Sequence, residues 1–228
     1  MIVAEQKGLD EIRTLVAEAE KVLVVGCGTC VTVCFSGGAH EAAILATALR
    51  MTSRVAGGTQ AVTDVSVQRQ CEWEFLDAIK DEVAAADLVL SLGCGVGVQA
   101  IAQAFPEARV VPGQNTVFLG QPTEHGVWEE RCTACGNCVL GKTGGICPIT
   151  RCSKSLLNGP CGGSQDGHCE IDPGVACAWH LIWERLSKTG QLETLMEIEP
   201  PKDWSTSHAG GPRRLVREDL RLVRDEEG

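Results

Sequence analysis

The sequence has few aromatic side chains and no segment long and apolar enough to cross a membrane. Tyrosine is absent, aromatic residues make up 4% of the chain, and no apolar run approaches the roughly 18 residues of a membrane span. The first residues, MIVAEQKGLDEIRTL, are polar and lack a signal-peptide pattern. The formal net charge of −10 disfavours binding to nucleic acid. We therefore expect a cytoplasmic protein with neither a membrane span nor a nucleic acid partner.

Sequence motifs of known catalytic sites are also missing. The chain has no nucleophile elbow, no phosphate-binding loop and no acid–base pair in a recognisable pocket motif. Gly26 and Gly28 form a G-x-G, but Val31 occupies the third glycine position, so the dinucleotide fingerprint fails. We therefore expect the chain itself to be non-catalytic. A small-ligand enzyme site at the carboxyl edge of the predicted sheet is a further alternative.

Cysteine, in contrast, is abundant. The 228 residues contain 13 cysteines, and this odd number excludes complete disulfide pairing within one chain. A cytosol keeps thiols reduced, and clustered cysteines there are more often metal ligands than crosslinks. The cysteines fall into one group within residues 27–94 and another within 132–177. The histidines follow no ligand spacing and are interpreted as ordinary side chains: His40, His125, His168, His180 and His208.

Residues 1–115 alternate between strand-like and helical patterns. Short apolar or β-branched runs predict strands at 21–26, 61–67, 86–93 and 108–113. Helical periodicity, or a place between two predicted strands, predicts helices at 8–20, 36–50, 71–84 and 97–105. Ser36 is the expected cap of the second helix. Strands that alternate with helices form parallel sheets. The predicted fold class is therefore α/β, with a small parallel-sheet, Rossmann-like N-terminal domain.

Residues 116–198 are predicted to form a second, irregular domain. A Gly/Pro/Asn-containing segment at 113–131 is interpreted as the connector. Residues 131–170 show little periodicity, so we expect this cysteine-rich domain to take its order from bound metal.

A C-terminal helix and an extended tail complete the prediction. Asp172 is the expected N-cap, Pro173 occupies the first turn and Gly190 ends the helix. Trp179 and Trp183 are predicted to pack in its core. Residues 199–228 are polar and are predicted to be an arm that is either solvated or wrapped around a partner.

The second cysteine group resembles iron–sulfur ligands more than zinc ligands. Its members are Cys132, Cys135, Cys138, Cys147, Cys152, Cys161, Cys169 and Cys177. The first three have the C-x2-C-x2-C spacing of ferredoxin loops, and Cys147 precedes proline, although the gap before it is longer than in ferredoxins. Eight thiols fit two 4Fe–4S clusters without remainder. One cluster plus zinc, or zinc alone at pairs such as Cys132/Cys135 and Cys147/Cys152, are the alternatives.

The first cysteine group predicts a third metal site. Cys27, Cys30 and Cys34 lie between a predicted strand and a predicted helix. Cys94 follows another predicted strand and is the favoured fourth ligand, with Cys71 as the alternative. A 4Fe–4S cluster is preferred here, and a four-cysteine zinc or a redox-active C-x2-C remain alternatives.

Three stretches resemble a known family. VLVVGCGTCVTVC, LSLGCGVGVQ and CTACGNCVLGKTGGICPITRCSKSLLNGPCGG are similar to the small cysteine-rich subunit of methylenetetrahydrofolate reductase from acetogenic and related anaerobic bacteria. The last of them also resembles the methylenetetrahydrofolate reductase C-terminal domain family.

The resemblance implies a partner and a role. The partner is a flavin-containing catalytic subunit that reduces methylenetetrahydrofolate to methyltetrahydrofolate in the one-carbon branch of acetyl-CoA synthesis (the Wood-Ljungdahl pathway), and a further electron-donating subunit is possible. This chain is then the electron-transfer subunit with two or three 4Fe–4S clusters, zinc at one site as an option, and no flavin of its own. The alternative is a zinc-stabilised structural or docking subunit of the same kind of complex.

Overall fold

The computed structural model describes residues 1–221 and divides into two compact units, the first spanning Met1–Arg131 and the second beginning at Cys132. The division lies after Arg131, whereas the sequence places it after residue 115. The difference arises because residues 114–132 form strands that pair back onto the first unit.

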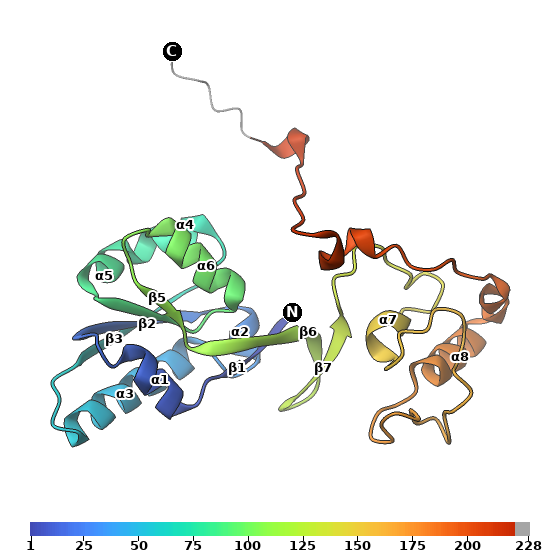
Figure 1. The fold of residues 1–228 in the computed structure, drawn as a ribbon, viewed down its shortest axis with the longest axis horizontal. Coiled ribbons are helices and arrows are strands. Elements are labelled where there is room, and N and C mark those ends of the chain that lie inside the picture. The colour runs from blue at the N-terminus through green and yellow to red at the C-terminus, as the bar shows by residue number, and fades with distance from the viewer. Residues whose placement is uncertain (222–228) are drawn as a thin grey trace, which may run out of the picture. The chain divides into compact units, whose positions relative to one another are not determined.

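The first unit contains a four-stranded parallel sheet, as predicted (Figure 1). Its strands are β2 (Lys21–Cys27), β3 (Ala61–Val67), β4 (Leu88–Ser91) and β5 (Val110–Pro112), in the order β3-β2-β4-β5. All three neighbouring pairs are parallel. The α/β fold class is therefore confirmed.

Helices cover both faces of this sheet (Figure 1). On one face α1 (Leu9–Val16) and α3 (Ala39–Val55) pack on a core that includes Ile12, Leu49 and Leu90. On the other face lie α4 (Trp73–Leu76), α5 (Lys80–Ala85) and α6 (Gly95–Ala104), with a core that includes Leu76 and Ile101. Aliphatic side chains thus fill a three-layer core with few aromatics, consistent with the composition.

Two local predictions in this unit are wrong. The helix expected at 71–84 is broken into α4, a 3-10 turn at Asp77–Ile79, and α5. Ser36 does not cap α3, because the helix begins after Gly38, whose N–H donates to Glu41 Oε2 at 2.9 Å. The Ser36 hydroxyl instead donates to the carbonyl of Val31 at 3.3 Å, within the loop that follows the short helix α2 (Cys30–Val33).

A second, three-stranded sheet was not predicted. It contains β1 (Ile2–Gln6), β6 (Gln114–Glu124) and β7 (Val127–Cys132) in the order β1-β6-β7. The segment interpreted as a connector is therefore mostly strand, and β6 pairs antiparallel with β1. The Gly and Pro residues of this segment suggested a loop, whereas pairing with the distant N-terminus decides its structure.

The second unit has little regular structure, as predicted. It contains α7 (Pro148–Arg151), α8 (Ala178–Thr189) and a 3-10 turn at Leu192–Met196. Its hydrophobic core is small and centres on Trp179, Ile182 and Leu186. Among the helices of residues 1–221, none combines the length and hydropathy needed to span a membrane.

The boundaries of α8 confirm the prediction for Gly190 and correct those for Asp172 and Pro173, and burial corrects the one for Trp183. Gly190 ends the helix in the left-handed conformation (φ 67°), as predicted. The helix begins after Cys177, not at Asp172, whose carboxylate accepts a hydrogen bond from the N–H of Gly174 at 2.9 Å in a separate turn. Trp179 is buried, but Trp183 is 53% exposed and not part of the core.

Candidate metal centres

The cysteines of the first unit gather at the carboxyl edge of the parallel sheet. Cys27 ends β2, Cys94 is the N-cap residue of α6 after β4, and Cys71 follows β3. The chain leaves β2 toward one face of the sheet through α3 and leaves the neighbouring strand β4 toward the other face through α6. The edge between β2 and β4 is therefore a topological switch point, where open α/β sheets bind their ligands.

A buried glutamine fixes the backbone beneath these thiols. Gln70 is fully buried, and its Nε2 donates to the carbonyls of Val25 (2.8 Å) and Gly26 (3.2 Å) in β2. Its Oε1 accepts from the Ser91 hydroxyl at 2.6 Å, and Ser91 Oγ accepts from the N–H of Gly93 at 3.1 Å. The amide thus connects the segment before Cys71 with the ends of β2 and β4.

Two glycines allow this close packing. A Cβ at Gly93 would overlap the Gln70 amide, and one at Gly97 in α6 would lie 2.9 Å from Gln70 Cβ. Larger residues at either position would push Gln70, and with it Cys71, away from the sheet edge. Sequence reasoning missed this network, and the repeated glycines of SLGCGVG were the available signal for it.

The remaining cysteines of the first unit differ in environment. Cys30 is partly exposed at the start of α2. Cys34 is buried, 7% exposed, and its Sγ donates to the carbonyl of Ile2 in β1 at 3.6 Å. Burial raises the pKa of Cys34, and the neighbouring Cys30 thiol raises it further, whereas a backbone hydrogen bond from Ala4 opposes the shift. The Cys34 sulfur therefore packs against β1.

In the second unit, four cysteines line one small cavity: Cys152, Cys161, Cys169 and Cys177. Cys152 follows α7, Cys177 is the N-cap residue of α8, and the other two come from the loops between these helices. Four thiols are the complete ligand set of a 4Fe–4S cluster and also of a structural zinc. The donor chemistry of the cavity therefore fits either centre. Its volume is about 20 Å³ in this structure.

The surroundings of Cys169 favour its thiolate form. The Ser153 hydroxyl lies 3.4 Å from Cys169 Sγ, and this hydrogen bond, with those from the backbone N–H groups of Asp172 and Ile171, lowers the pKa of Cys169. On the same wall Lys154 forms an ion pair with Glu170. Because metal ligands must be deprotonated, these contacts prepare Cys169 for metal binding.

The other four cysteines of this unit lie on the loop that opens it and at the start of α7. The N–H of Ala134 donates to Cys132 Sγ at 3.3 Å, and Cys135 Sγ contacts the carbonyl of Asn137 at 3.5 Å. Cys147 is the N-cap residue of α7, with Thr150 Oγ1 3.6 Å from its Sγ. Cys138 is exposed. Among residues 1–221, no group of three or more His, Cys, Asp or Glu is arranged as a metal-ion site.

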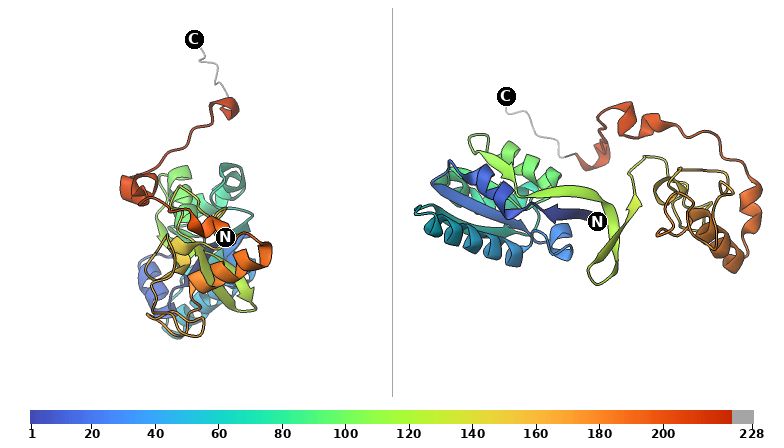
Figure 2. Two further views of the ribbon diagram at one scale, coloured as in Figure 1. Left: turned by 90° about the vertical axis from the view of Figure 1, so that its right-hand side faces the viewer. Right: turned by 60° about the horizontal axis from the view of Figure 1, so that its bottom comes forward.

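The C-terminal arm folds back on this cysteine loop; the arm is the extended red segment that follows α8 in Figure 2. Thr206 Oγ1 donates to the carbonyl of Cys135 at 2.8 Å, and Lys202 Nζ donates to that of Asn137 at 3.2 Å. Arg213 Nη1 donates to the carbonyl of Ala134 at 2.6 Å. The predicted arm therefore wraps its own cysteine loop through residue 213. Its last residues, 222–228, lie outside the described part of the chain.

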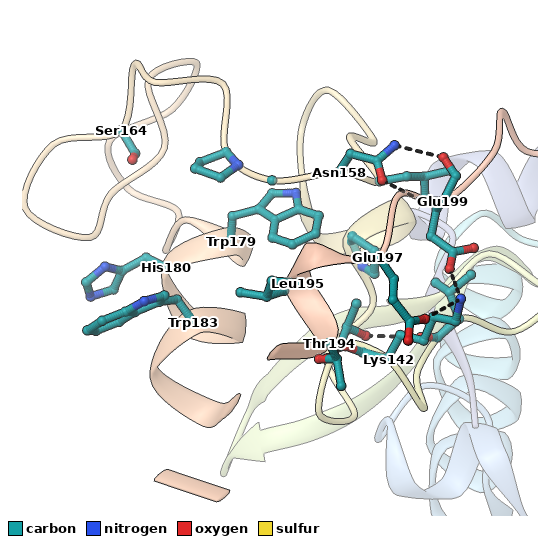
Figure 3. Close-up of a pocket in the computed structure, with 16 residues that line it drawn as sticks. Lys142, Asn158, Ser164, Trp179, His180, Trp183, Thr194, Leu195, Glu197 and Glu199 are labelled. Carbon is teal, nitrogen blue, oxygen red and sulfur yellow. Dashed lines mark hydrogen bonds and ion pairs between the residues drawn. The ribbon is translucent and has the colours of Figure 1, made fainter. Parts of the chain in front are cut away.

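Figure 3 shows a larger pocket of the second unit, with a volume of about 340 Å³. Trp179 and Trp183 of α8 form one wall. On the other, Lys142 forms ion pairs with Glu197 (3.5 Å) and Glu199, and the Glu199 hydrogen bond raises the pKa of Lys142 most. Asn158 exchanges two hydrogen bonds with the Glu199 backbone, of 2.9 and 2.7 Å. Pro148 and Pro160, which adjoin Cys147 and Cys161, also line the pocket.

Comparison with known proteins supports the sequence resemblance. Residues 111–205 match the family model described as methylene-tetrahydrofolate reductase C terminal. No curated protein and no solved structure gives a significant match. The matched residues include all eight cysteines of the second unit and none of the five in the first. The resemblance of the C-terminal segment is therefore confirmed: residues 111–205 of this chain are related to the methylene-tetrahydrofolate reductase C-terminal family.

Proposed function

We propose that this chain is the iron–sulfur electron-transfer subunit that delivers electrons to a flavin-containing methylenetetrahydrofolate reductase catalytic subunit. The observation that carries the proposal is the cavity shared by Cys152, Cys161, Cys169 and Cys177 within the segment related to that reductase family. A 4Fe–4S cluster, when bound, supplies one-electron transfer at a potential set by its hydrogen bonds and exposure.

The residues around the cavity have separate parts in this proposal. Cys152 and Cys177 pack against the buried apolar side chains of Trp179, Ile182 and Leu186. These side chains keep water from one side of the cavity. Ser153 and the backbone after Cys169 favour its thiolate. Because hydrogen bonds to sulfur and local dryness both tune reduction potentials, these side chains set the driving force for electron transfer.

The remaining thiols of the second unit form the second set: Cys132, Cys135, Cys138 and Cys147. Their C-x2-C-x2-C spacing followed by a Cys-Pro is the ferredoxin-like part of the sequence. The arm residues Lys202, Thr206 and Arg213 hold the carbonyls of this loop. The reductase subunit is the electron acceptor in this proposal, within the one-carbon branch of acetyl-CoA synthesis, and a separate subunit donates the electrons.

Metal analysis of anaerobically purified protein tests the metal content. About eight to twelve irons per chain with matching acid-labile sulfide are expected for two or three clusters. Cys161→Ala should remove about four irons, whereas Ser164→Ala, a change on the same cavity wall, should remove none. One or two zinc ions without sulfide would contradict the proposal.

A coupled assay tests electron delivery. Cys135→Ser should abolish transfer to the catalytic subunit, while that subunit alone still reacts with an artificial electron donor. Full coupled activity of the variant would show that the cysteine loop carries no electrons.

A zinc-stabilised docking subunit is the second candidate, and the size of the cavity favours it. A volume of about 20 Å³ is room for one water-sized atom, and four thiols around such a space are the ligand set of a single zinc ion. The metal analysis separates the two, because the zinc protein contains no sulfide and is colourless.

A further inference from the structure

The strand-end cysteines of the first unit lie outside the segment related to the reductase family. Three of them lie at the carboxyl ends of three adjacent parallel strands: Cys27 is the last residue of β2, Cys71 follows β3 and Cys94 follows β4. Neighbouring parallel strands bring their carboxyl ends to one edge, so these thiols share the switch point.

The backbone around them is fixed independently of any ligand. Gly28 N–H donates to the carbonyl of Val67 at 2.9 Å, which holds the residue after Cys27 against the end of β3. The Gln70 side chain forms hydrogen bonds with the backbone of β2 and with Ser91. Gly93 and Gly97, on either side of Cys94, have no Cβ and so leave room for Gln70. Cys71 is therefore held beside both Cys27 and Cys94.

The electrostatics of Cys71 agree with this placement. Although the residue is exposed, atoms packed around its sulfur desolvate the thiol and raise the pKa of Cys71. The neighbouring sulfurs of Cys27 and Cys94 also raise the pKa of Cys71, whereas a backbone hydrogen bond opposes the shift, so the three sulfurs lie close enough to interact.

Cys34 is in a different position. Its sulfur is buried and donates to the Ile2 carbonyl in β1, and Val31 and Ser36 close the loop around it through backbone and hydroxyl bonds. Cys30, the first residue of α2, is partly exposed and is closer than Cys34 in sequence to Cys27. Of the two cysteines that follow Cys27, Cys30 is therefore the candidate fourth ligand.

We propose that Cys27, Cys30, Cys71 and Cys94 are the four ligands of a metal centre at the switch point of the first unit, and that Cys34 is a structural thiol and not a ligand. The ligand set differs from the one expected from the sequence, since both Cys71 and Cys94 belong to it. Under the proposed function, on which this inference rests, the centre is a third 4Fe–4S cluster.

The test compares single alanine variants of the full-length chain by iron and sulfide content. Cys71→Ala and Cys94→Ala should each lose about four of about twelve irons, and Cys34→Ala should keep all of them. Thermal unfolding of each variant checks that the first unit is folded.

A second measurement needs no metal. Mild oxidation of the metal-stripped chain with diamide, followed by peptide mass spectrometry, should link Cys71 to Cys27 or Cys94 and leave Cys34 as a free thiol. Links between Cys71 and Cys34 would overturn the ligand set. So would eight irons in the wild type that stay unchanged in the Cys71 and Cys94 variants, and this result would leave the proposed function standing. A chain without iron or sulfide would contradict the proposed function itself.

Discussion

The two units hold their cysteines by different means. In the first, Cys27, Cys71 and Cys94 stand at the edge of a sheet whose two faces are covered by helices and filled with aliphatic side chains. In the second, most of the thiols lie on loops, and the core is one short helix packed by a few residues around Trp179 and Ile182. We infer that the larger apolar core of the first unit orders it without metal, whereas the proposed metal centres would supply much of the order of the second.

This difference predicts that removing metal affects one unit and spares the other. When any bound metal is extracted with a chelator and a mild oxidant, backbone amides of α8 and of residues 132–177 should exchange with solvent at least about a hundredfold faster, since the proposed metal centres would be the main source of order there. Amides of β2 and β4 should keep their protection. Hydrogen exchange with mass spectrometry measures both in one sample.

The comparison would break if both units lost protection together, because the first unit would then also depend on its metal. Equal protection in both forms would show that the loops of the second unit are ordered by their own contacts.

Truncation of a buried side chain should have a different effect in each unit. Ile101 and Ile182 are both fully buried. Ile101→Ala should lower the free energy of unfolding of the first unit by about 2–5 kcal/mol with or without metal, since its cavity lies within a large core. Ile182→Ala should weaken metal retention by the second unit, because folding and the proposed metal binding would be coupled there. Urea unfolding and metal release, measured on both variants, provide the check. An Ile101→Ala cost that disappears when metal is bound would contradict the distinction.

The same contrast explains which features were predictable from the sequence. β2 and β3 were predictable because runs such as KVLVVG and AVTDVSV carry their own pattern of burial. β1 and β6 could not be predicted in this way, because they pair residues that are far apart in the chain, such as Ile2 and Leu119. The prediction for Trp183 failed because its helical spacing fits a core face, yet this helix buries only one narrow side.

The candidate sites show the same limit. The residue type and the spacing identified the cysteines, but the grouping of Cys152, Cys161, Cys169 and Cys177 around one cavity depends on the loops between α7 and α8, which have no periodic signal. The role of Gln70 was also hidden, because a glutamine beside a strand gives no sign that it will be buried.

The arm offers a test on the cysteine loop with a smaller expected effect. Gly136 has φ +82°, and a Cβ there would overlap the carbonyl of Thr206 in the arm. Gly136→Ala should therefore displace the arm and increase proteolytic cleavage within residues 199–217 several-fold. Gly126→Ala is the matched control, because Gly126 has φ +83° and open space around its Cβ position. Similar cleavage of both variants would mean that backbone strain alone, and not contact with Thr206, accounts for the effect.

The smallest expected effect concerns the pH at which the second unit would release the metal proposed for it. The hydrogen bond from Ser153, the largest contribution, lowers the pKa of Cys169, so the folded protein favours the thiolate. A lowered pKa in the folded state stabilises the ligand at and above the ordinary thiol pKa, and this contribution is lost as the pH falls through the lowered value. Ser153→Ala removes that hydrogen bond, so the pKa of Cys169 should rise and metal release on acidification should begin at a higher pH than in the wild type.

Ser164→Ala, a change in the lining of the same cavity, should leave the release profile unchanged. Metal release followed with a chromogenic chelator across a pH series measures the shift, and coincident profiles for the wild type and Ser153→Ala would show that Ser153 does not act on Cys169.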